Sequence, residues 1–557
     1  MEQNLTLTYL PLGGAGGVTK NMHVYELRDE ILIIDCGLGF ADETMLGVEL
    51  LLPDITYLKN AVTNGKKIVG MAISHGHEDH FGALPFLLPD LPSFPIVASP
   101  LTAEFANSKL KEFGINQRVQ KVDFDGGEVR LGPFSLQFIR VTHSVPDTAH
   151  IFIKTPIGNF YHGSDFKFEP NPFDGKKSDL EKISELSKQG VTCLMSDCLR
   201  AEQKGHIKSE SMILPALERE LAKTQGKFIV TTYSSNIARV GQIIEAAKKT
   251  GRKVCFVGRS MLNTKEMAVN FGYLKIERGM EVALEQLKNY KDSNIVMIAA
   301  GSQGQEHSAL SRIVNGDHRD IKLNPSDTVV FSSDAIPGNE ISVNSLIDNI
   351  ARRGARAIYS TIADDLHVSG HGAQEELGLL MDLTKPKNVL PIGGTYKQMI
   401  QYKTLAKERG INEKNIILTD TGQSIIFTKE GVAILGKKIH LKNVFVDQIS
   451  GEEVESYVLR DRQKLAMDGV VILMVEIDAS NGQLVDKPNI IVRGLSATET
   501  DQITKELIRQ LKNSLSQKKN QVTDWIYMRK FVLEISEKYI FKNLRKRPLI
   551  LPVIIEV

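Results

Sequence analysis

Three histidines and two carboxylates fall within six consecutive residues, His75 to His80, which read HGHEDH. The chain has only 13 histidines among its 557 residues, so this density is unusual for a plain polar turn. The apolar run IVGMAIS stands directly before the cluster and predicts a strand that ends there. Imidazole and carboxylate groups together suit a divalent ion such as zinc, and the segment therefore predicts a metal site.

The spacing inside this cluster allows two ions. His75 and His77 are two residues apart, so at a strand exit both imidazoles can point at one ion. Asp79 and His80 follow at the turn and can face a second ion nearby.

Three other β-rich runs end in residues of the ligand type. LQFIRVT leads to His143, GNFYHGS leads to Asp165, and EILII leads to Asp35. One histidine at a strand end is more often structural, but several such residues after HxHxDH favour a ligand set. A carboxylate such as Asp165 can bridge two cations, and Asp35 can orient a histidine ligand from behind.

The elements around these residues change style along the chain. Residues 1–200 predict short strands, interrupted by helices at 101–114 and 179–190. From about 206 helix and strand alternate, which is typical of an α/β layout with a largely parallel sheet. Short strands are expected again after about 372, followed by a connector at 440–460. From about 465 the pattern predicts strand, strand, helix, helix and strand.

Length and composition set outer limits on function. A chain of 557 residues suggests about three domains. The 68 Lys and Arg nearly balance the 67 Asp and Glu, so any contact with nucleic acid must come from a local groove. The four cysteines form no CxxC pair, which favours a reducing compartment. With no signal-peptide pattern and no run of 18 apolar residues, we expect a cytoplasmic protein with no membrane contact.

Several longer motifs point to one family. HGHEDHFGALPFLL, VTHSVPDTAHIFIKTPIG, IPGNE, HVSGHGAQEEL and VLRDRQKLAMDGVV occur in this order. They resemble the ribonuclease J family of β-CASP ribonucleases along nearly the whole chain. The resemblance implies an α/β fold: a metallo-β-lactamase αββα sandwich, an inserted β-CASP α/β domain and a small α+β C-terminal domain. The expected boundaries are 1–205 and 373–450 for the sandwich, 206–372 for the insertion, and 451–557 for the linker and C-terminal domain.

The resemblance also implies a function. Such proteins are metal-dependent ribonucleases that hydrolyse single-stranded RNA as 5′-to-3′ exonucleases, as endonucleases, or as both, in RNA maturation and decay. Two Zn²⁺ ions are expected, and Mn²⁺ can replace them when it is plentiful. A homodimer or tetramer is the expected assembly, and a hetero-oligomer with a paralogue is an alternative.

Roles for individual residues follow from the same resemblance. His75, His77 and His143 would hold one zinc, Asp79 and His80 the other, and Asp165 would bridge them. Asp79 would also position the attacking hydroxide, His371 would protonate the leaving oxygen, and Asp35 and Asp197 would support the site. The residues expected to contact RNA are Tyr233, Ser234, Ser235, Asn236, His367, Val368, Ser369, Gly370 and His371. For Tyr233 to Asn236 a plain turn after a strand is a serious alternative.

The chain departs from the family pattern in three places. The family has Pro, an apolar residue, His, Gly and Glu where this chain reads Pro391 to Thr395, so Gly393 replaces a ligand of the second zinc. Glu306-His307 replaces the usual Pro-Met, and Leu199-Arg200 replaces the usual Thr-Asn. His307 could substitute for the missing ligand, but it belongs to the inserted domain, and we give this idea little weight. The departures predict a weakened second zinc site.

Three functional hypotheses result. The first is a metal-dependent ribonuclease. The second is a catalytically weak or inactive paralogue that acts as an RNA-binding or partner subunit of a ribonuclease complex. The third is a thioester or lactone hydrolase with the same core fold, against which the inserted domain counts.

Overall fold

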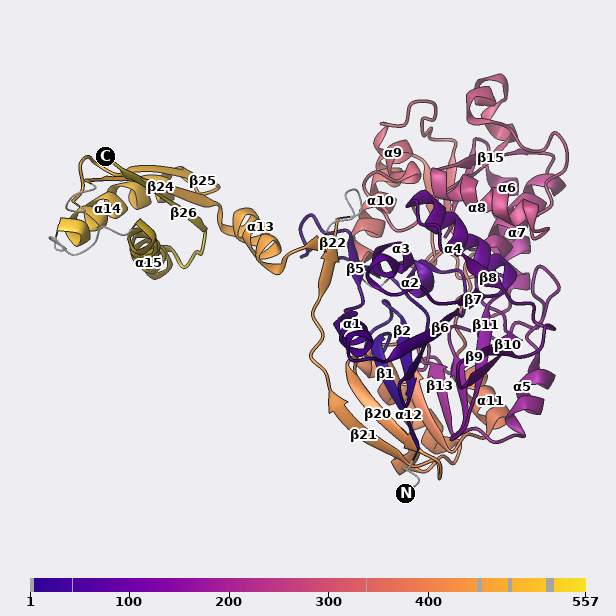
Figure 1. Ribbon diagram of the computed structural model, residues 1–557. Helices are drawn as coiled ribbons and strands as arrows, with labels where there is room; N and C mark the ends of the chain where they lie inside the picture. The colour runs from indigo at the N-terminus through magenta and orange to yellow at the C-terminus, as the bar shows by residue number, and fades with distance from the viewer. Residues whose placement is uncertain (1–4, 43, 337, 448–452, 479–482, 517–524) are drawn as a thin grey trace. The chain divides into compact units, whose positions relative to one another are not determined.

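The computed structural model describes residues 5–42, 44–336, 338–447, 453–478, 483–516 and 525–557 (Figure 1). The chain forms two compact units. One comprises Met1–Phe40 and Leu51–Asn443, and the other comprises Ala41–Leu50 and Val444–Val557. None of the described helices combines the length and the apolar character needed to cross a bilayer.

Two sheets face each other in the first unit. The eight-stranded sheet has the order β21-β20-β1-β2-β3-β6-β7-β8, and the six-stranded sheet has the order β19-β13-β12-β11-β10-β9. The strands of the first sheet are β1 (Thr6–Gly13), β2 (Met22–Leu27), β3 (Glu30–Ile34), β6 (Lys67–Ile73), β7 (Ile96–Ala98), β8 (Val119–Lys121), β20 (Gln423–Thr428) and β21 (Ala433–Lys438). Those of the second are β9 (Val129–Leu131), β10 (Phe134–Arg140), β11 (Ala149–Thr155), β12 (Gly158–Gly163), β13 (Cys193–Asp197) and β19 (Asn388–Ile392).

One apolar core joins the two sheets, with Leu7 and Tyr25 from the first sheet packed with Phe138 and Phe160 from the second. A second core lies on the outer face of the six-stranded sheet, where Tyr161 packs with residues of the helices that cover it. These helices are α5 (Leu180–Ser187), α11 (Gln374–Thr384) and α12 (Tyr396–Glu408). The helices between the strands of the other sheet are α1 (Thr56–Thr63), α2 (Glu78–Phe81), α3 (Leu84–Leu87) and α4 (Pro100–Glu112), with the 3₁₀ turn η1 (Leu88–Asp90). The result is an αββα sandwich.

The last two strands of the large sheet come from far along the chain. In Figure 1 the orange strands β20 and β21 lie beside the indigo strands β1 and β2, and β20 pairs with β1. The sandwich is therefore built from segments on both sides of an insertion.

The inserted segment forms its own parallel sheet in the order β15-β16-β14-β17-β18. Its strands are β14 (Phe228–Thr231), β15 (Lys253–Val257), β16 (Ile295–Ala299), β17 (Thr328–Phe331) and β18 (Arg356–Ile358). Its helices are α6 (Ile213–Lys223), α7 (Ile237–Lys249), α8 (Arg259–Asn270), α9 (Ala309–Asn315) and α10 (Glu340–Arg352), with 3₁₀ turns η2 (Glu210–Met212), η3 (Leu284–Asn289) and η4 (Asp292–Asn294). The predicted alternation of helix and parallel strand is confirmed here.

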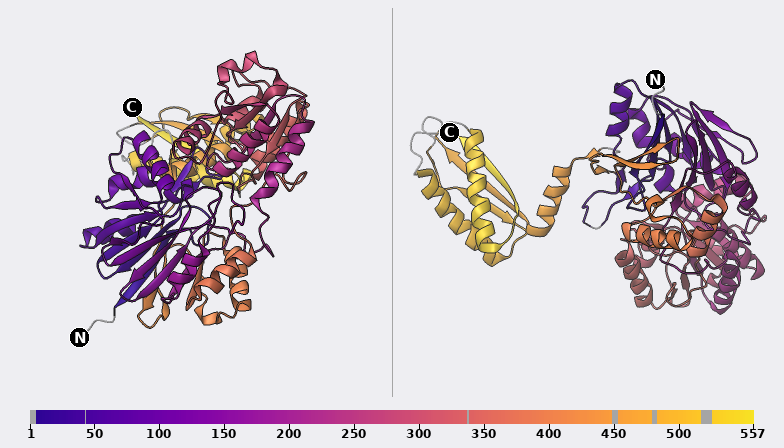
Figure 2. Two further views of the ribbon diagram at one scale, coloured as in Figure 1. Left: turned by 90° about the vertical axis from the view of Figure 1, so that its right-hand side faces the viewer. Right: turned by 90° about the horizontal axis from the view of Figure 1, so that it is seen from below.

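The second unit contains a three-stranded sheet with β24 (Val470–Ile477) in the centre (Figure 2). β25 (Asn489–Arg493) pairs antiparallel to β24, and β26 (Leu549–Glu556) pairs parallel to it. Helices α14 (Ala497–Ser516) and α15 (Trp525–Leu544) supply Leu507, Leu511 and Val532 to its core. The predicted order of strand, strand, helix, helix and strand is confirmed. The chain also contains these short elements: β4 (Gly39–Phe40), β5 (Leu50–Leu52), β22 (Val444–Val446), β23 (Glu453–Val454) and η5 (Glu413–Asn415).

Two expectations about secondary structure are incomplete. The stretch after residue 372 contains the expected short strands β19, β20 and β21, but also the helices α11 and α12, which were not expected. The buried residues Met399, Tyr402 and Leu405 of α12 are three apart, which is a helical spacing. The expected connector at 440–460 includes the start of a helix, α13 (Ser456–Asp468), while residues 448–452 of it lie outside the described residues.

Candidate metal centre

The side chains predicted to bind metal gather where strands of both sheets end. His75 follows β6, and His77 is the residue before α2. His143 follows β10, Asp165 follows β12, and Asp197 is the last residue of β13. The apolar residues of each strand are buried in the sandwich. The first polar residues after the strand therefore lie at the edge where the strands end.

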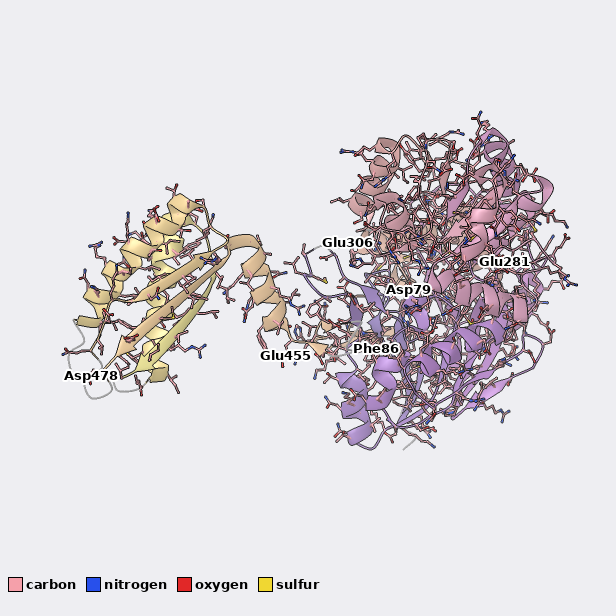
Figure 3. The ribbon with its side chains drawn as sticks, turned by 90° about the horizontal axis from the view of Figure 1, so that it is seen from above. Asp79, Phe86, Glu281, Glu306, Glu455 and Asp478 are labelled. Carbon is pink, nitrogen blue, oxygen red and sulfur yellow. The ribbon has the colours of Figure 1, made fainter. Side chains whose placement is uncertain are left out.

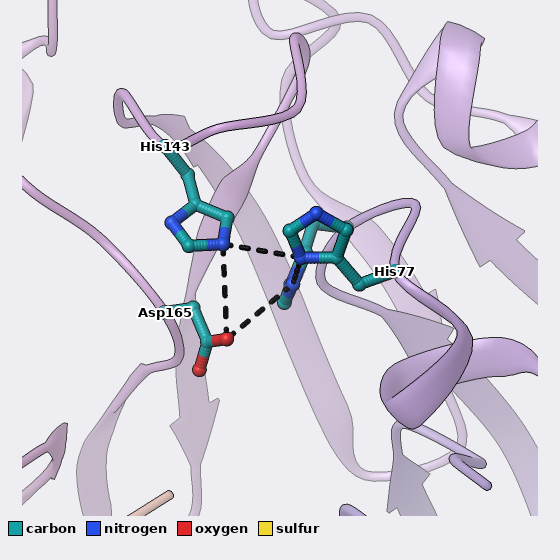
Figure 4. A group of neighbouring side chains, drawn as sticks. His77, His143 and Asp165 are labelled. Carbon is teal, nitrogen blue, oxygen red and sulfur yellow. Dashed lines mark hydrogen bonds and ion pairs between the residues drawn. The ribbon is translucent and has the colours of Figure 1, made fainter. Parts of the chain in front are cut away.

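Three imidazoles and one carboxylate form the first group. His77 Nδ1 is 3.1 Å from His75 Nε2 and 3.1 Å from His143 Nε2 (Figure 4). Asp165 Oδ2 is 3.6 Å from His75 Nε2 and 3.8 Å from His143 Nε2. Two nitrogens that each lie about 2.0 Å from a tetrahedral zinc are about 3.3 Å apart. The spacing of the imidazole nitrogens therefore fits one such ion.

In His75 and His143, the ring nitrogen that faces away from His77 has a hydrogen-bond partner. His75 Nδ1 is 3.0 Å from the hydroxyl of Ser74, and His143 Nδ1 is 2.7 Å from the carbonyl oxygen of Gly370. Because a carbonyl only accepts hydrogen bonds, His143 carries its proton on Nδ1 and leaves the Nε2 lone pair for an ion. Burial lowers the pKa of both His75 and His143 well below the ordinary value, which keeps them in the neutral form that binds metal.

Among the residues that the structure describes, the second group contains three potential ligands, Asp79, His80 and Asp165. His80 Nε2 is 3.6 Å from Asp79 Oδ2 and 3.4 Å from Asp165 Oδ2. The opposite nitrogen, Nδ1, is 2.8 Å from Asp35 Oδ2, so Asp35 orients this imidazole as predicted for a residue behind the ligands. Asp165 Oδ2 faces both groups.

Two features weaken the second group as an ion site. Gly393 stands opposite Asp165 and offers no side chain. The amide Nδ2 of Asn21 is 3.1 Å from His80 Nε2, which is the nitrogen turned toward Asp79 and Asp165. The same Nδ2 donates to the backbone carbonyl oxygens of Val18 at 3.0 Å and Asp79 at 3.2 Å, which hold the amide beside His80. Asn21 was not singled out in the sequence, because its approach to His80 joins segments 59 residues apart.

The electrostatics of the two histidine environments differ. Burial acts to lower the pKa of His80, but the carboxylates of Asp165, Asp79 and Asp35 outweigh it, and the pKa lies well above the ordinary value. Burial raises the pKa of Asp79 to about 6, although His80 opposes the shift. The excess of carboxylate charge around His80 is the environment that a cation would neutralise.

His371 and Asp197 form a pair next to these groups. His371 Nδ1 is 2.8 Å from Asp197 Oδ2, and His371 Nε2 is 3.9 Å from Asp165 Oδ2. Burial alone would lower the pKa of His371, but the carboxylates of Asp197 and Asp165 raise it to about 9. His371 is therefore protonated near pH 7, with Nε2 turned toward the Asp165 side.

The residues expected to contact RNA occupy different environments. Tyr233, Ser234 and Ser235 are partly exposed in the loop after β14. Asn236 is buried, and its side chain accepts a hydrogen bond from the Arg239 N–H as the N-cap of α7. Its side chain thus caps α7, and the expected RNA contact of Asn236 stays a prediction.

In the second predicted RNA-binding segment, Val368 is also buried and can offer only its backbone. His367, Ser369, Gly370 and His371 are each partly exposed. The hydroxyl of Ser369 accepts the N–H of His371 at 3.1 Å. The carbonyl oxygen of Gly370 contacts His143, so this loop of the insertion supports the metal centre directly.

His307 does not replace the missing ligand. It is exposed, and it belongs to none of the described groups of His, Cys, Asp and Glu that can hold an ion. Figure 3 labels its neighbour Glu306 and the candidate ligand Asp79.

A buried ionic network was missed in the sequence. Glu210 accepts hydrogen bonds from Lys167 at 2.9 Å and from Arg239 at 3.0 Å. Arg239 also donates to the carbonyl oxygens of Ser332 and Leu366. Lys167 is two residues after Asp165, so the network ties the loop that carries the bridging carboxylate to α7 of the insertion.

The fold and the site together define a metallohydrolase of the metallo-β-lactamase type that carries an inserted α/β domain. Residues 15–188 match the metallo-beta-lactamase superfamily, and residues 225–350 match the family described as "Ribonuclease J, beta-CASP domain". Residues 358–418 match the "Zn-dependent metallo-hydrolase RNA specificity domain", and residues 457–557 match the "Ribonuclease J C-terminal domain".

Similar proteins cover the whole chain. Ribonuclease J of Synechocystis sp. is 36% identical over 99% of this chain and 86% of its own length. Ribonuclease J 1 of Streptococcus pyogenes is 34% identical over 98% of this chain and 96% of its own, and Ribonuclease J2 of Bacillus subtilis is 31% identical over 98% of both. The chain belongs to the ribonuclease J family. A solved protein of unknown function from Enterococcus faecalis shares the fold, with a TM-score of 0.52 and 15% identity over 76% of this chain and 100% of that chain.

Proposed function

We propose that the protein is a metal-dependent ribonuclease that hydrolyses phosphodiester bonds of single-stranded RNA. The observation that carries this proposal is the convergence of His75, His77, His143 and Asp165 on one point beside the His371–Asp197 pair. Its membership of the ribonuclease J family, and its match to an RNA specificity domain, identify RNA as the substrate class.

A divalent ion bound in this centre would supply a water-derived nucleophile near neutral pH and would offset charge on the phosphate. His75, His77 and His143 would hold it, each in the neutral form that burial favours. Asp79, with its pKa near 6, is ionised at pH 7 to 8 and accepts the proton of the attacking water. His371 donates a proton from Nε2 to the leaving oxygen, and Asp197 orients its ring through Nδ1.

The finer activity is proposed as 5′-to-3′ exonuclease action, endonuclease action or both, in RNA maturation and decay. Zn²⁺ is the proposed ion, with Mn²⁺ as a substitute, because histidine and carboxylate ligands accept both. A cytoplasmic location and a homodimer or tetramer, or a hetero-oligomer with a paralogue, complete the proposal. The partly exposed residues Tyr233, Ser234, Ser235, His367 and Ser369 remain the candidates for RNA contact.

A second function is favoured by one specific observation. Gly393 gives no ligand and Asn21 occupies His80 Nε2, so a second ion has a poor site. A chain that cannot hold this ion would act as a weakly active RNA-binding or partner subunit of a ribonuclease complex.

One experiment separates these functions. Metal content of the purified protein is measured alongside degradation of a 5′-monophosphorylated single-stranded RNA, with and without added Mn²⁺ or Zn²⁺. Cleavage that disappears on chelation and returns with the metal supports the enzyme. Tight RNA binding with no cleavage at any metal concentration supports the partner subunit. A thioester and lactone substrate panel tests the hydrolase alternative, which predicts turnover there and none on RNA.

A further inference from the structure

Two of the departures from the family pattern lie side by side. Strands β13 and β19 are parallel neighbours, with Asp197 paired with Ile392. Gly393 directly follows Ile392, and Arg200 is three residues after Asp197. The Cys198 N–H donates to the Ile392 carbonyl oxygen at 3.1 Å, which keeps the two chain segments together beyond the strands. The position that lost an imidazole and the position that gained a guanidinium thus leave the same edge of one sheet.

The guanidinium of Arg200 reaches from this sheet to the insertion. Its Nη2 donates to Asp334 Oδ2 at 3.0 Å, and its Nη1 donates to Gln203 Oε1 at 3.2 Å. Asp334 follows β17 of the inserted sheet. The side chain of Arg200 is 35% exposed and that of Asp334 is 41% exposed, so solvent reaches both partners.

Residues expected to contact RNA surround this ion pair. The Tyr233 hydroxyl donates to the Asp334 carbonyl oxygen at 2.8 Å, and His367 Nε2 is 3.5 Å from Asp334 Oδ2. Gln303 donates to the same carbonyl oxygen. β14 and β17 are neighbours in the parallel sheet, and ligands of such sheets bind beyond the carboxyl ends of the strands.

A half-exposed ion pair of this kind adds little to stability, because water screens it. A guanidinium, by contrast, has the planar geometry that matches two phosphate oxygens at once. In the free protein Asp334 therefore pairs with Arg200 only weakly, and a phosphate can replace it as the partner of the guanidinium.

We propose that Arg200 binds a phosphate of the RNA chain beside the bond that is cut, and that Asp334 is the counter-ion which this phosphate displaces. The guanidinium brings positive charge to the edge where Gly393 leaves the second ion poorly held. The inference rests on the proposed function, because it takes single-stranded RNA as the ligand.

Binding of a non-cleavable RNA tests the proposal without depending on catalysis. A fluorescent 2′-O-methyl oligonucleotide is titrated with wild type, Arg200→Ala, Arg200→Lys and Asp334→Asn, and anisotropy gives Kd at several salt concentrations. Arg200→Ala should weaken binding by about tenfold, the loss of a charged hydrogen bond. It should also reduce the slope of log Kd against log salt by about 0.7, the value for one phosphate contact on a single strand. Arg200→Lys should recover part of the affinity and the whole slope.

The Asp334→Asn variant makes the test decisive. It keeps the size and the backbone acceptor but removes the competing charge, so RNA should bind more tightly than to wild type. A merely structural ion pair predicts the opposite, because either substitution would then loosen the same loop and weaken binding together. Arg219→Ala breaks another exposed pair in the insertion, with Asp365, and should leave Kd within about twofold of wild type. Thermal melting of each variant confirms that it is folded.

The outcomes separate this inference from the proposed function. Opposite shifts for Arg200→Ala and Asp334→Asn support the phosphate site even if the wild type cuts no RNA. Unchanged binding in Arg200→Ala, or weaker binding in both variants, overturns it even if the wild type is an active nuclease.

Discussion

Gly393 lies opposite the carboxylate of Asp165, so that a Cβ at position 393 would be 3.6 Å from Asp165 Oδ1. Among the described residues other than its two chain neighbours, the other heavy atom within 4 Å of that Cβ is Asp197 Oδ1, at 3.7 Å. A longer side chain at this position would start beside the carboxylates of Asp165 and Asp197. The backbone there has a φ of +66°, and its N–H donates to the Gly14 carbonyl oxygen. The same glycine therefore removes a ligand and adopts a conformation that favours glycine.

Metal stoichiometry should reflect this asymmetry. We expect about one tightly held ion per chain, in the His75, His77 and His143 group, because loss of a direct ligand costs more than the 10- to 100-fold typical of an outer contact. RNA cleavage should rise with added Mn²⁺ or Zn²⁺, since mass action fills a weak site. Elemental analysis of the purified chain and a metal titration of activity check this. Two tightly held ions in the wild type would contradict it.

Restoring the imidazole tests the cause. Gly393→His should raise occupancy of the second site and flatten the dependence of activity on added metal. A non-glycine residue in the left-handed region costs roughly 1 to 2 kcal/mol, so the variant should also melt earlier than wild type. Gly393→Ala is the matched control, since it carries the same strain without a ligand. Equal metal content in the two variants would show that position 393 cannot reach the ion.

Asp79→Asn should abolish most of the nuclease activity while the protein remains folded. The amide is a poorer ligand and cannot accept the proton of the attacking water. We expect a fall in kcat of at least about a hundredfold, the lower end for loss of a general base. Cleavage assays at saturating metal, with circular dichroism of the variant, measure this. Wild-type cleavage by a folded variant would remove Asp79 from the mechanism.

How far a feature of the site could be predicted from the sequence depends on how close together its residues stand in the chain. The ligand set was predictable because HxHxDH is local, and because His143 and Asp165 each follow a strand that its own apolar pattern predicts. Gly393 was found as a gap in a known motif. Asn21 against His80, Gly370 against His143 and Arg200 against Asp334 were not predictable, because each pair joins separate elements that only the folded sheets bring together.

The sequence pattern alone does not separate helix from strand in the segments of α11 and α12. Both segments are flanked by strands, and the helical spacing of their buried residues is the signal that separates them from the short strands around them. The buried role of Asn236 was likewise hidden, because Asn serves equally well as a helix cap and as an exposed polar contact.

The 5′ end of the RNA should influence its rate of degradation. The segment from His367 to His371 holds its backbone beside the metal centre through Gly370, and Ser369 and the backbone N–H groups can face a terminal phosphate. We expect 5′-monophosphorylated RNA to be degraded faster than 5′-triphosphorylated RNA of the same sequence, because a closed backbone pocket accepts less charge and bulk. Parallel time courses on the two RNAs measure the ratio, with a circular RNA as the control for internal cutting. Equal rates on both linear substrates would indicate that no pocket senses the end.

The buried network around Glu210 should set the acid stability of the inserted domain. Burial acts to raise the pKa of Glu210, but Arg239 and Lys167 outweigh it and lower the pKa to about 2. A depressed carboxyl pKa contributes stability above the ordinary value near 4.5, and that contribution is lost as the pH falls toward 2. Glu210→Gln removes the carboxylate charge that the buried cations Arg239 and Lys167 share. Lys167 keeps Glu169 at 3.6 Å, and the substitution should destabilise the insertion by about 3 to 5 kcal/mol.

Hydrogen exchange of the α7 amides between pH 7 and pH 3 measures this loss where it occurs. The wild type should lose protection as the pH falls through that range, and Glu210→Gln should start lower and change less. Glu413→Gln, at an exposed glutamate paired with Lys403 and Lys407, is the matched control and should leave α7 protection unchanged. Wild-type protection of α7 in Glu210→Gln would show that Arg239 is held by the carbonyl oxygens of Ser332 and Leu366 alone.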